Sequence, residues 1–213
     1  MVKQKLVIVG MTLIKGKIVK TGNDRAVFTC LGASNHALED RENDDYYATE
    51  PKAAELLLEV EPELNNIWEC ACGAGHLAEV FRKAGKLNLA TDIVNRGYGD
   101  GIRDFLDENI IGYVGDIVTN PPYKHAEKFV TKALEIVPDG NKVCMFLKIL
   151  FLESKSRKKL FKKYPSKVIY VSSSRITCAK NGDFESYPSS ALAYAWYVWE
   201  KGFNGETVIK WIN

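Results

Sequence analysis

The chain has 213 residues, a mass of 23.9 kDa and a hydrophobic content of 46%. This length and composition predict one globular domain with a sizeable core and argue against a disordered protein. No apolar run approaches the roughly 20 residues that a membrane helix needs, so we expect no membrane span and a soluble, intracellular protein. The five cysteines are odd in number and scattered, and therefore favour neither disulfides nor a metal site.

The small net charge of +2 conceals an uneven distribution. Residues 1–140 carry 16 Lys and Arg against 22 Asp and Glu, whereas residues 141–213 carry 13 against 5. Much of the positive charge lies within 148–167, beside a single acid, Glu153. Such a cluster suits the phosphate backbone of a nucleic acid, although a solvated helix face would have the same composition. The candidate nucleic-acid contacts in it are Lys155, Arg157, Lys158, Lys159, Lys162 and Lys163.

Three zones follow one another along the chain. Residues 1–30 contain two β-rich runs, KLVIVGMTLI and RAVFTC, separated by the turn signal TGND, and could form a hairpin or an appended arm. Residues 31–45 are polar and acidic, as is typical of a linker. We therefore expect a β-rich arm and acidic linker over 1–45 and one domain over 46–213, in which 151–190 is the basic region that could contact nucleic acid.

From residue 46 onward, the apolar pattern alternates between strands and helices. The expected helices are 51–60, 76–84, 102–108, 124–137 and 152–163, and the expected strands are 66–72, 87–93, 112–119, 142–149 and 167–173. The C-terminal run ALAYAWYVWEKGFNGETVIKWI has two β-rich parts around a GFNG turn, which indicates antiparallel strands. Together these patterns predict a Rossmann-like α/β fold with a mostly parallel seven-stranded sheet, an antiparallel edge strand and helices on both faces.

The stretch NIWECACGAGHLAEVF places a glycine turn between a strand and a helix. The strand ends near Glu69, and Gly73 and Gly75 precede the helix. Small residues here let the backbone approach a nucleotide-like ligand at the carboxyl edge of a sheet, although a tight turn without a ligand explains two glycines equally well. The next strand ends with Asp92, where an acid either accepts hydrogen bonds from ribose hydroxyls or begins a surface turn.

Two further strand ends carry residues of chemical interest. Asp104 could accept the exocyclic amine of an adenine while Phe105 packs on its face, or the pair could be a helix cap and a core residue. The tetrapeptide Asn-Pro-Pro-Tyr, Asn120–Tyr123, follows a run typical of a buried strand. Because prolines lack the N–H that a ladder needs, the strand cannot continue through it, so something other than sheet pairing requires these residues.

This tetrapeptide resembles the catalytic motif of S-adenosylmethionine-dependent amino-methyltransferases, especially adenine-N6 DNA methyltransferases. WECACGAG is similar to the first cofactor motif of that family, and DYYATEP resembles its N-terminal cofactor element. The order of the motifs is similar to the γ arrangement, and the whole chain resembles small phage- or prophage-encoded members. The resemblance implies a class I methyltransferase fold. By the same resemblance, the cofactor-binding residues are Tyr47, Thr49, Glu69, Ala71, Cys72, Gly73, Gly75, Asp92, Asp104 and Phe105.

The resemblance also implies a reaction: methyl transfer from S-adenosylmethionine to N6 of a flipped adenine in DNA, with S-adenosylhomocysteine as product. An adenine amine is a poor nucleophile because its lone pair is delocalised into the ring. The Asn120 side-chain oxygen and the Pro121 carbonyl would hold its hydrogens. Pro122 would stiffen the turn, and Tyr123 would offer a flat face to the base. No metal is needed for this chemistry.

The resemblance further implies DNA as the partner and the cytoplasm of a bacterial or phage-infected cell as the location. Arg175, in the polar loop 172–190, is one more candidate DNA contact, unless that loop is an ordinary surface connection. Other acceptors suit the same motif, namely the glutamine amide of protein release factors, an RNA amine and cytosine N4. A different class of protein is a catalytically inactive, DNA-associated module that binds S-adenosylmethionine. The recognition sequence and the oligomeric state stay open.

Overall fold

The computed structural model describes residues 11–14, 17–20, 46–186 and 192–213. The chain divides into two units, Met1–Asp44 and Asp45–Asn213. In the first unit, β1 (Met11–Ile14) pairs antiparallel with β2 (Lys17–Lys20), and Ile14 lies opposite Lys17. The expected run RAVFTC, the turn TGND and the linker lie outside the described residues.

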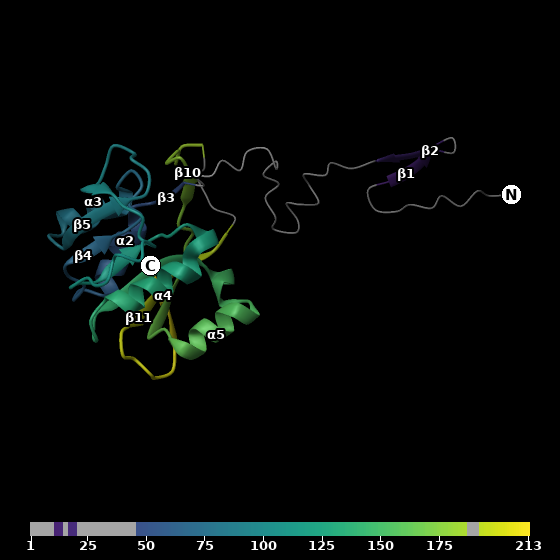
Figure 1. The fold of residues 1–213 in the computed structure, drawn as a ribbon. Coiled ribbons are helices and arrows are strands. Elements are labelled where there is room, and N and C mark those ends of the chain that lie inside the picture. The colour runs from purple at the N-terminus through teal and green to yellow at the C-terminus, as the bar shows by residue number, and fades with distance from the viewer. Residues whose placement is uncertain (1–10, 15–16, 21–45, 187–191) are drawn as a thin grey trace. The chain divides into compact units, whose positions relative to one another are not determined.

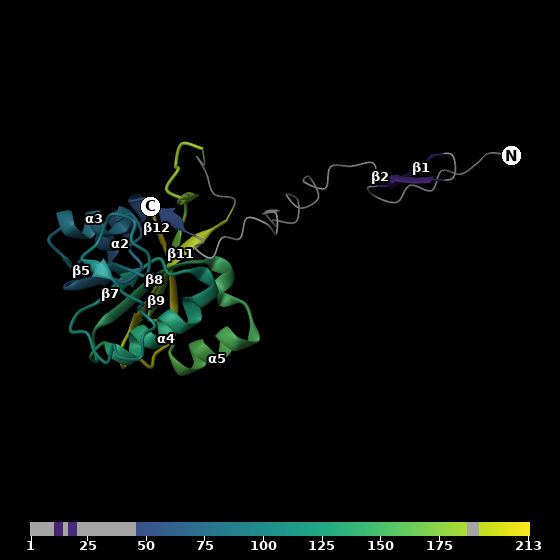
Figure 2. The same ribbon diagram turned by 45° about the horizontal axis from the view of Figure 1, so that its top comes forward.

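The second unit is built on an eight-stranded sheet with the order β12-β9-β11-β8-β7-β4-β5-β6. Figure 2 labels β5, β7 and β8, which lie in this order across the sheet with β4 between β5 and β7. The strands are β4 (Ile67–Glu69), β5 (Leu87–Asp92), β6 (Gly101–Ile102), β7 (Ile117–Thr119), β8 (Lys142–Lys148), β9 (Val168–Ser172), β11 (Tyr194–Glu200) and β12 (Val208–Ile212). All neighbouring strands are parallel except β11, which runs antiparallel to both β8 and β9.

The expected α/β architecture with a mostly parallel sheet is confirmed, but two details of it differ. The sheet has eight strands rather than seven, and its antiparallel strand lies between β8 and β9 rather than at the edge. The burial pattern explains the placement: six of the seven residues of β11 are buried, whereas only Ile212 of β12 is buried. A strand that is apolar on both faces belongs inside a sheet, so β12 takes the edge, parallel to β9.

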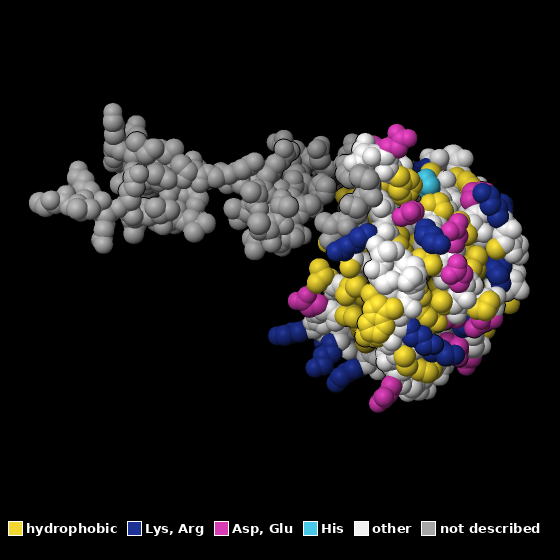
Figure 3. Space-filling model, turned by 180° about the vertical axis from the view of Figure 1, so that it is seen from behind, with side chains coloured by type: hydrophobic (Ala, Val, Ile, Leu, Met, Phe, Trp, Pro, Cys, Tyr) yellow, Lys and Arg dark blue, Asp and Glu magenta, His cyan; other side chains and the backbone are white. Residues whose placement is uncertain are grey.

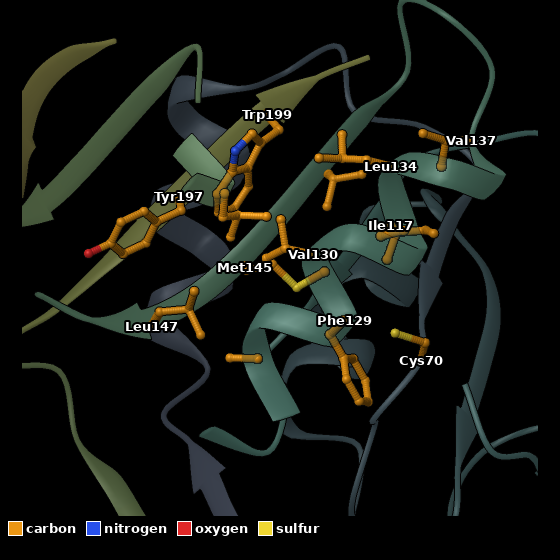
Figure 4. Packing of buried hydrophobic residues seen from close by; sticks show 14 of the residues in the cluster. Cys70, Ile117, Phe129, Val130, Leu134, Val137, Met145, Leu147, Tyr197 and Trp199 are labelled. Atoms are coloured by element: carbon orange, nitrogen blue, oxygen red, sulfur yellow. The ribbon is translucent and has the colours of Figure 1, made fainter. Parts of the chain in front are cut away.

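Helices cover both faces of the sheet. They are α2 (Lys52–Val60), α3 (His76–Lys83), α4 (Ala126–Ile136) and α5 (Lys155–Lys163), with short 3₁₀ turns η1 (Tyr123–His125) and η2 (Ile149–Leu152). Successive residues of β8 alternate between two cores: Met145 packs with α4 and α5, and Phe146 packs with α2 and α3. Figure 4 shows the first core, in which Met145 and Leu147 face Val130 of α4. This alternation follows from the two-residue period of a strand.

Two expected elements next to the sheet differ from the structure. Residues 102–108 were expected to be helical, but Ile102 ends β6 and turns follow it, because the side chains of Asp104 and Asp107 accept the backbone N–H groups two residues further on. The strand expected over 112–119 begins only at Ile117. Gly115 has φ +153 and approaches the backbone of Asn66 too closely for any side chain, so the chain bends there.

A small second sheet was not expected from the sequence. β3 (Tyr47–Thr49) pairs antiparallel with β10 (Cys178–Lys180), and Thr49 lies opposite Cys178. Figure 1 shows the two strands side by side. Backbone hydrogen bonds from Glu50 N to Thr177 O and from Asn181 N to Tyr46 O extend the pairing at both ends. Part of the polar loop 172–190 is therefore a strand that is tied to the beginning of the domain.

A buried ion cluster joins α2 to the amino-terminal end of β8. The Lys142 ammonium contacts the carboxylates of Glu61 and Glu63, and Tyr170 donates a 2.8 Å hydrogen bond to Glu61. Glu61 and Lys142 are only 5% and 8% exposed. Charges removed from water in this way are tolerated only when each has its partner.

Lys142→Ala should lower the free energy of unfolding by about 3–5 kcal/mol, because it leaves the buried Glu61 carboxylate without its cation. Urea denaturation of the full chain measures the change. Lys167→Ala is the matched control, since Lys167 pairs with Glu200 at the surface, and we expect its effect to stay below about 1 kcal/mol. Equal effects of the two substitutions would contradict this account of the cluster.

Candidate functional site

The candidate site lies where parallel strands end. Because β4, β5, β7 and β8 are parallel, the segments that follow them meet at one edge of the sheet. The structure thereby brings the glycine turn after β4, Asp92 at the end of β5 and the tetrapeptide Asn120–Tyr123 after β7 to the same edge.

Asp92 holds the glycine turn in place. Its Oδ2 accepts a 2.7 Å hydrogen bond from Gly73 N, and its Oδ1 accepts one of 2.9 Å from Val94 N. Gly73 and Gly75 both have positive φ, at +55 and +87, a conformation that glycine adopts without strain. The Asp92 carboxylate, which was expected to contact a ribose, therefore also fixes the glycine turn. Each of its oxygens already accepts one hydrogen bond, so a ligand would bind to the lone pairs that remain.

Two tyrosines that the sequence analysis did not single out lie against these glycines. A Cβ on Gly73 would be 2.2 Å from the Tyr46 ring, and one on Gly75 would be 2.5 Å from the Tyr98 ring. The Tyr46 hydroxyl accepts a 3.0 Å hydrogen bond from Ala74 N, and the Arg96 guanidinium lies 4.3 Å from the Tyr46 ring centroid. Burial raises the pKa of this hydroxyl, so it stays protonated. Sequence spacing gave no signal for these ring contacts.

Glu69 ends β4 as a buried carboxylate. It is 1% exposed; the Thr119 hydroxyl and the Ala71 N–H are near its oxygens, but neither forms a hydrogen bond of good geometry with it. Burial raises its pKa to about 8. The buried hydroxyl of Thr119, at the end of β7, likewise has no partner within the part of the chain that the structure describes. Buried polar groups are normally satisfied, so an unsatisfied carboxylate at a strand end is a strong candidate for holding a ligand's donor.

Other residues assigned to the cofactor have different surroundings. Cys72 is 7% exposed and packs with Ala78 and Ala90, and Ala71 is partly buried against the larger core. The backbone of Cys72 is also engaged, because its N–H donates to Thr91 O at 2.9 Å and its carbonyl accepts from Gly75 N at 2.8 Å. Thr49 does not face the glycine turn but contacts Asn120.

The assignment of Phe105 to adenine packing needs correction. Its ring is 2% exposed and lies 5.3 Å from the Trp68 ring and 4.9 Å from the Phe129 ring, measured between centroids. A ring enclosed in the core in this way offers no face to a ligand. Asp104 beside it is exposed, and its Oδ1 accepts a hydrogen bond from Leu106 N. A hollow near this edge is lined by Val94, Asn95, Tyr98, Gly99, Asp100, Gly101 and Ile102.

The Asn120 side chain is held in one orientation. Its Nδ2 donates a 2.7 Å hydrogen bond to Thr49 Oγ1 and a longer one, 3.5 Å, to the Tyr47 carbonyl. Its Oδ1 is buried and has no partner among the described residues. Pro121 is buried and Pro122 is exposed at the start of η1. The strand β3 thus orients the amide so that an acceptor oxygen remains available.

The Tyr123 ring lies between groups from three strands. Its hydroxyl donates to Cys178 Sγ at 3.7 Å, its ring stacks with Tyr194 at a centroid distance of 6.1 Å, and Lys148 Nζ lies 4.5 Å from its centroid. Burial raises its pKa well above the usual value. Tyr194 and Lys148 are site neighbours that sequence reasoning missed, because β11 and β8 come next to each other only in the folded sheet.

The basic helix α5 is largely solvated, with one exception. Lys155, Lys158, Lys159, Lys162 and Lys163 are exposed, as is Arg175 in the loop after β9. Figure 3 shows Lys and Arg side chains projecting from this side of the domain. Arg157 is different, because its guanidinium donates to the carbonyls of Leu150 and Glu153 and lies over the Phe151 ring. Part of its donor capacity therefore holds η2 in place, and its role as a DNA contact stays a prediction.

Comparison with known proteins supports the fold but not a closer relationship. No protein-family model matches the chain, and no curated protein matches its sequence. The M protein of the type I restriction enzyme EcoKI superposes with a TM-score of 0.51 at 15% identity, covering 77% of this chain and 45% of that one. The type IIG restriction endonuclease BpuSI superposes with a TM-score of 0.52 at 16% sequence identity, and the match covers 77% of this chain and 26% of that one. A chain of a type I R-M system superposes with a TM-score of 0.52 at 15% sequence identity, and the match covers 78% of this chain and 45% of that one.

The chain thus spans less than half the length of these three structural neighbours. It shares a Rossmann-like α/β fold with them. Within the described residues, no helix is long and apolar enough to cross a membrane. The same residues contain no group of three His, Cys, Asp or Glu side chains placed to hold a metal ion.

Glu69→Gln should change how stability depends on pH. A carboxyl with its pKa raised from near 4.5 to about 8 in the folded protein binds more protons there than in the unfolded chain. The free energy of unfolding of the wild type should therefore fall as pH rises from about 5 to 8, by up to about 1.4 kcal/mol per unit. Denaturation at several pH values should show a flatter profile for Glu69→Gln, and an unchanged one for the exposed control Glu59→Gln.

Proposed function

We propose that the protein transfers a methyl group from S-adenosylmethionine to the exocyclic N6 amine of adenine in DNA and releases S-adenosylhomocysteine. The observation that carries the proposal is the Asn120 amide, whose nitrogen is bound to Thr49 while its buried oxygen is left to accept a hydrogen. Tyr123 follows at the same edge, and the acceptor oxygen lies on the fold that class I methyltransferases use.

The residues at the glycine turn fit S-adenosylmethionine. Glu69 offers a buried carboxyl group that is mostly protonated near neutral pH; the ammonium of the cofactor's amino-acid part would favour its ionised form. We assign Asp92, at the end of β5, to the ribose hydroxyls, and Asp104 with the hollow beside Gly101 to the adenine. When bound, the cofactor supplies an electrophilic methyl group. Tyr46 and Tyr98, which cover the glycines, would line this ligand or move aside for it.

The chain's own residues position the acceptor amine. Asn120 Oδ1 accepts one hydrogen of the amine and the Pro121 carbonyl accepts the other, which draws the nitrogen toward tetrahedral geometry. Thr49 prevents the amide from rotating, because it takes the Nδ2 hydrogen. Tyr123 contacts the flipped base, with its ring fixed by Tyr194. Catalysis then rests on holding the reacting atoms in line, and the surplus proton leaves to solvent.

The basic helix α5 favours nucleic acid over a protein amide as the substrate. Its five exposed lysines lie in the segment that follows β8, whose last residue Lys148 contacts the Tyr123 ring. Phosphate neutralisation by such lysines gives affinity without sequence specificity. The structural neighbours EcoKI and BpuSI are named as parts of restriction systems, which supports DNA. A release-factor glutamine, an RNA amine and cytosine N4 are the alternative acceptors, and a module without turnover is the alternative class.

Asn120→Ala should lower methyl transfer about 100-fold or more, because it removes an oriented acceptor needed at the reacting nitrogen. Binding of S-adenosylmethionine, measured by calorimetry, should change little. Labelled cofactor is incubated with unmethylated DNA, RNA or release factor, and label on DNA adenine supports the proposal. Asn109→Ala is the matched control, since Asn109 bonds Asp107 at the surface. Transfer by Asn120→Ala at the wild-type rate would contradict the assigned chemistry.

Replacing Lys158, Lys159, Lys162 and Lys163 by Ala should flatten the salt dependence of DNA binding. Each phosphate contact that is lost reduces the slope of log K against log salt by about 0.9. Fluorescence anisotropy at several salt concentrations measures this slope. A variant with Ala at the exposed Lys52 and Lys83 should keep the wild-type slope. An equal slope for the α5 variant would show that the helix is only a solvated face.

A further inference from the structure

Two exposed leucines stand on the turn η2, directly after β8. Leu150 is 59% exposed and Leu152 is 44% exposed, while Phe151 between them is buried at 5%. Single exposed apolar side chains are ordinary. Two large ones on a four-residue turn beside a candidate active site need a further explanation.

The backbone of this turn is firmly held. The Tyr197 hydroxyl lies 3.2 Å from the carbonyl oxygens of both Lys148 and Ile149. Arg157 Nη1 donates to the carbonyl of Leu150 at 2.9 Å and to that of Glu153 at 3.1 Å. The Phe151 ring packs edgewise on the rings of Phe161 and Tyr197. The leucines are therefore exposed from a rigid support.

The turn lies between the acceptor pocket and the basic helix. Lys148, whose ammonium is 4.5 Å from the Tyr123 ring centroid, immediately precedes it. Two trans peptide units separate the Cα atoms of Lys148 and Leu150 by no more than about 7.6 Å. On the other side, α5 begins at Lys155, three residues after Leu152. Along the chain, the leucines therefore lie between the residue that contacts Tyr123 and the first lysine of α5.

We propose that Leu150 and Leu152 insert against the base stack of the substrate DNA beside the flipped adenine, an inference that rests on the function proposed above. Removing a base from the duplex costs a few kcal/mol of stacking. Apolar side chains that enter the base step cover the surfaces exposed in this way. The neighbouring lysines identify the occupant as nucleic acid, since a row of exposed cations complements phosphates and would burden an apolar protein interface.

The test compares duplex and single-stranded DNA as substrates. Sheared unmethylated genomic DNA is used native and heat-denatured, with labelled S-adenosylmethionine and the full chain. Leu150→Ala with Leu152→Ala should lower the methylation rate on native DNA about 10-fold and the rate on denatured DNA less than 2-fold, because a single strand needs no extrusion of the base. Replacing both leucines by Met, which keeps the apolar volume, should restore the rate on native DNA.

The matched control places Ala at Val208 and Ile209, which are 49% and 48% exposed on the edge strand β12. Its ratio of native to denatured rates should equal that of the wild type. Suppose that the wild type labels DNA. If the leucine variant then keeps the wild-type ratio of native to denatured rates, or if the control lowers that ratio as much as the leucine variant does, the insertion is overturned while the proposed function stands. If the wild type labels no DNA, the proposed function fails and the insertion with it. Thermal unfolding of each variant establishes that it is folded.

Discussion

The acceptor side of the site depends on the burial of β11 between β8 and β9. Its aromatic side chains fix the surrounding elements: Tyr194 stacks on Tyr123, Tyr197 binds the carbonyls that begin η2, and Trp199 donates to the carbonyl of Tyr164 at the end of α5. A strand buried on both faces has no freedom to shift its register without moving every side chain to the wrong face. Contacts with this one rigid strand therefore hold the tetrapeptide, the turn that carries the exposed leucines and the end of the basic helix.

A second dependence runs between the two ends of the domain. Thr49 on β3 receives the Asn120 amide hydrogen, and Cys178 on β10 receives the hydroxyl hydrogen of Tyr123. Because β3 and β10 pair with each other, one small ribbon orients both polar groups of the tetrapeptide. This coupling gives β3 and the loop after β9 a shared role in orienting the tetrapeptide, which in the proposed function is the preorganisation of the acceptor pocket.

The fold keeps two unsatisfied acceptors at the same edge. Glu69 and the Asn120 oxygen are buried without partners among the described residues, although most buried polar atoms in folded proteins are hydrogen-bonded. At the opposite end of the sheet, the buried Glu61 has both Lys142 and Tyr170 as partners. The contrast shows that this fold can supply hydrogen-bond and ion-pair partners to a buried acid. Unsatisfied acceptors at the carboxyl edge are consistent with positions that a ligand completes.

The sequence alone determined the α/β alternation, the glycine turn, Asp92 and the tetrapeptide, because each is a local pattern of period, turn chemistry or missing N–H groups. Only the tertiary structure decided which residues surround them. It placed Phe105 in the core, bonded Arg157 to the backbone of η2, and brought Lys148 and Tyr194 to Tyr123. These outcomes depend on strand order and on pairings such as that of Thr49 with Cys178, which lie far apart in the chain. Strand order follows from how completely each face is buried, a property of the assembled sheet rather than of any local stretch.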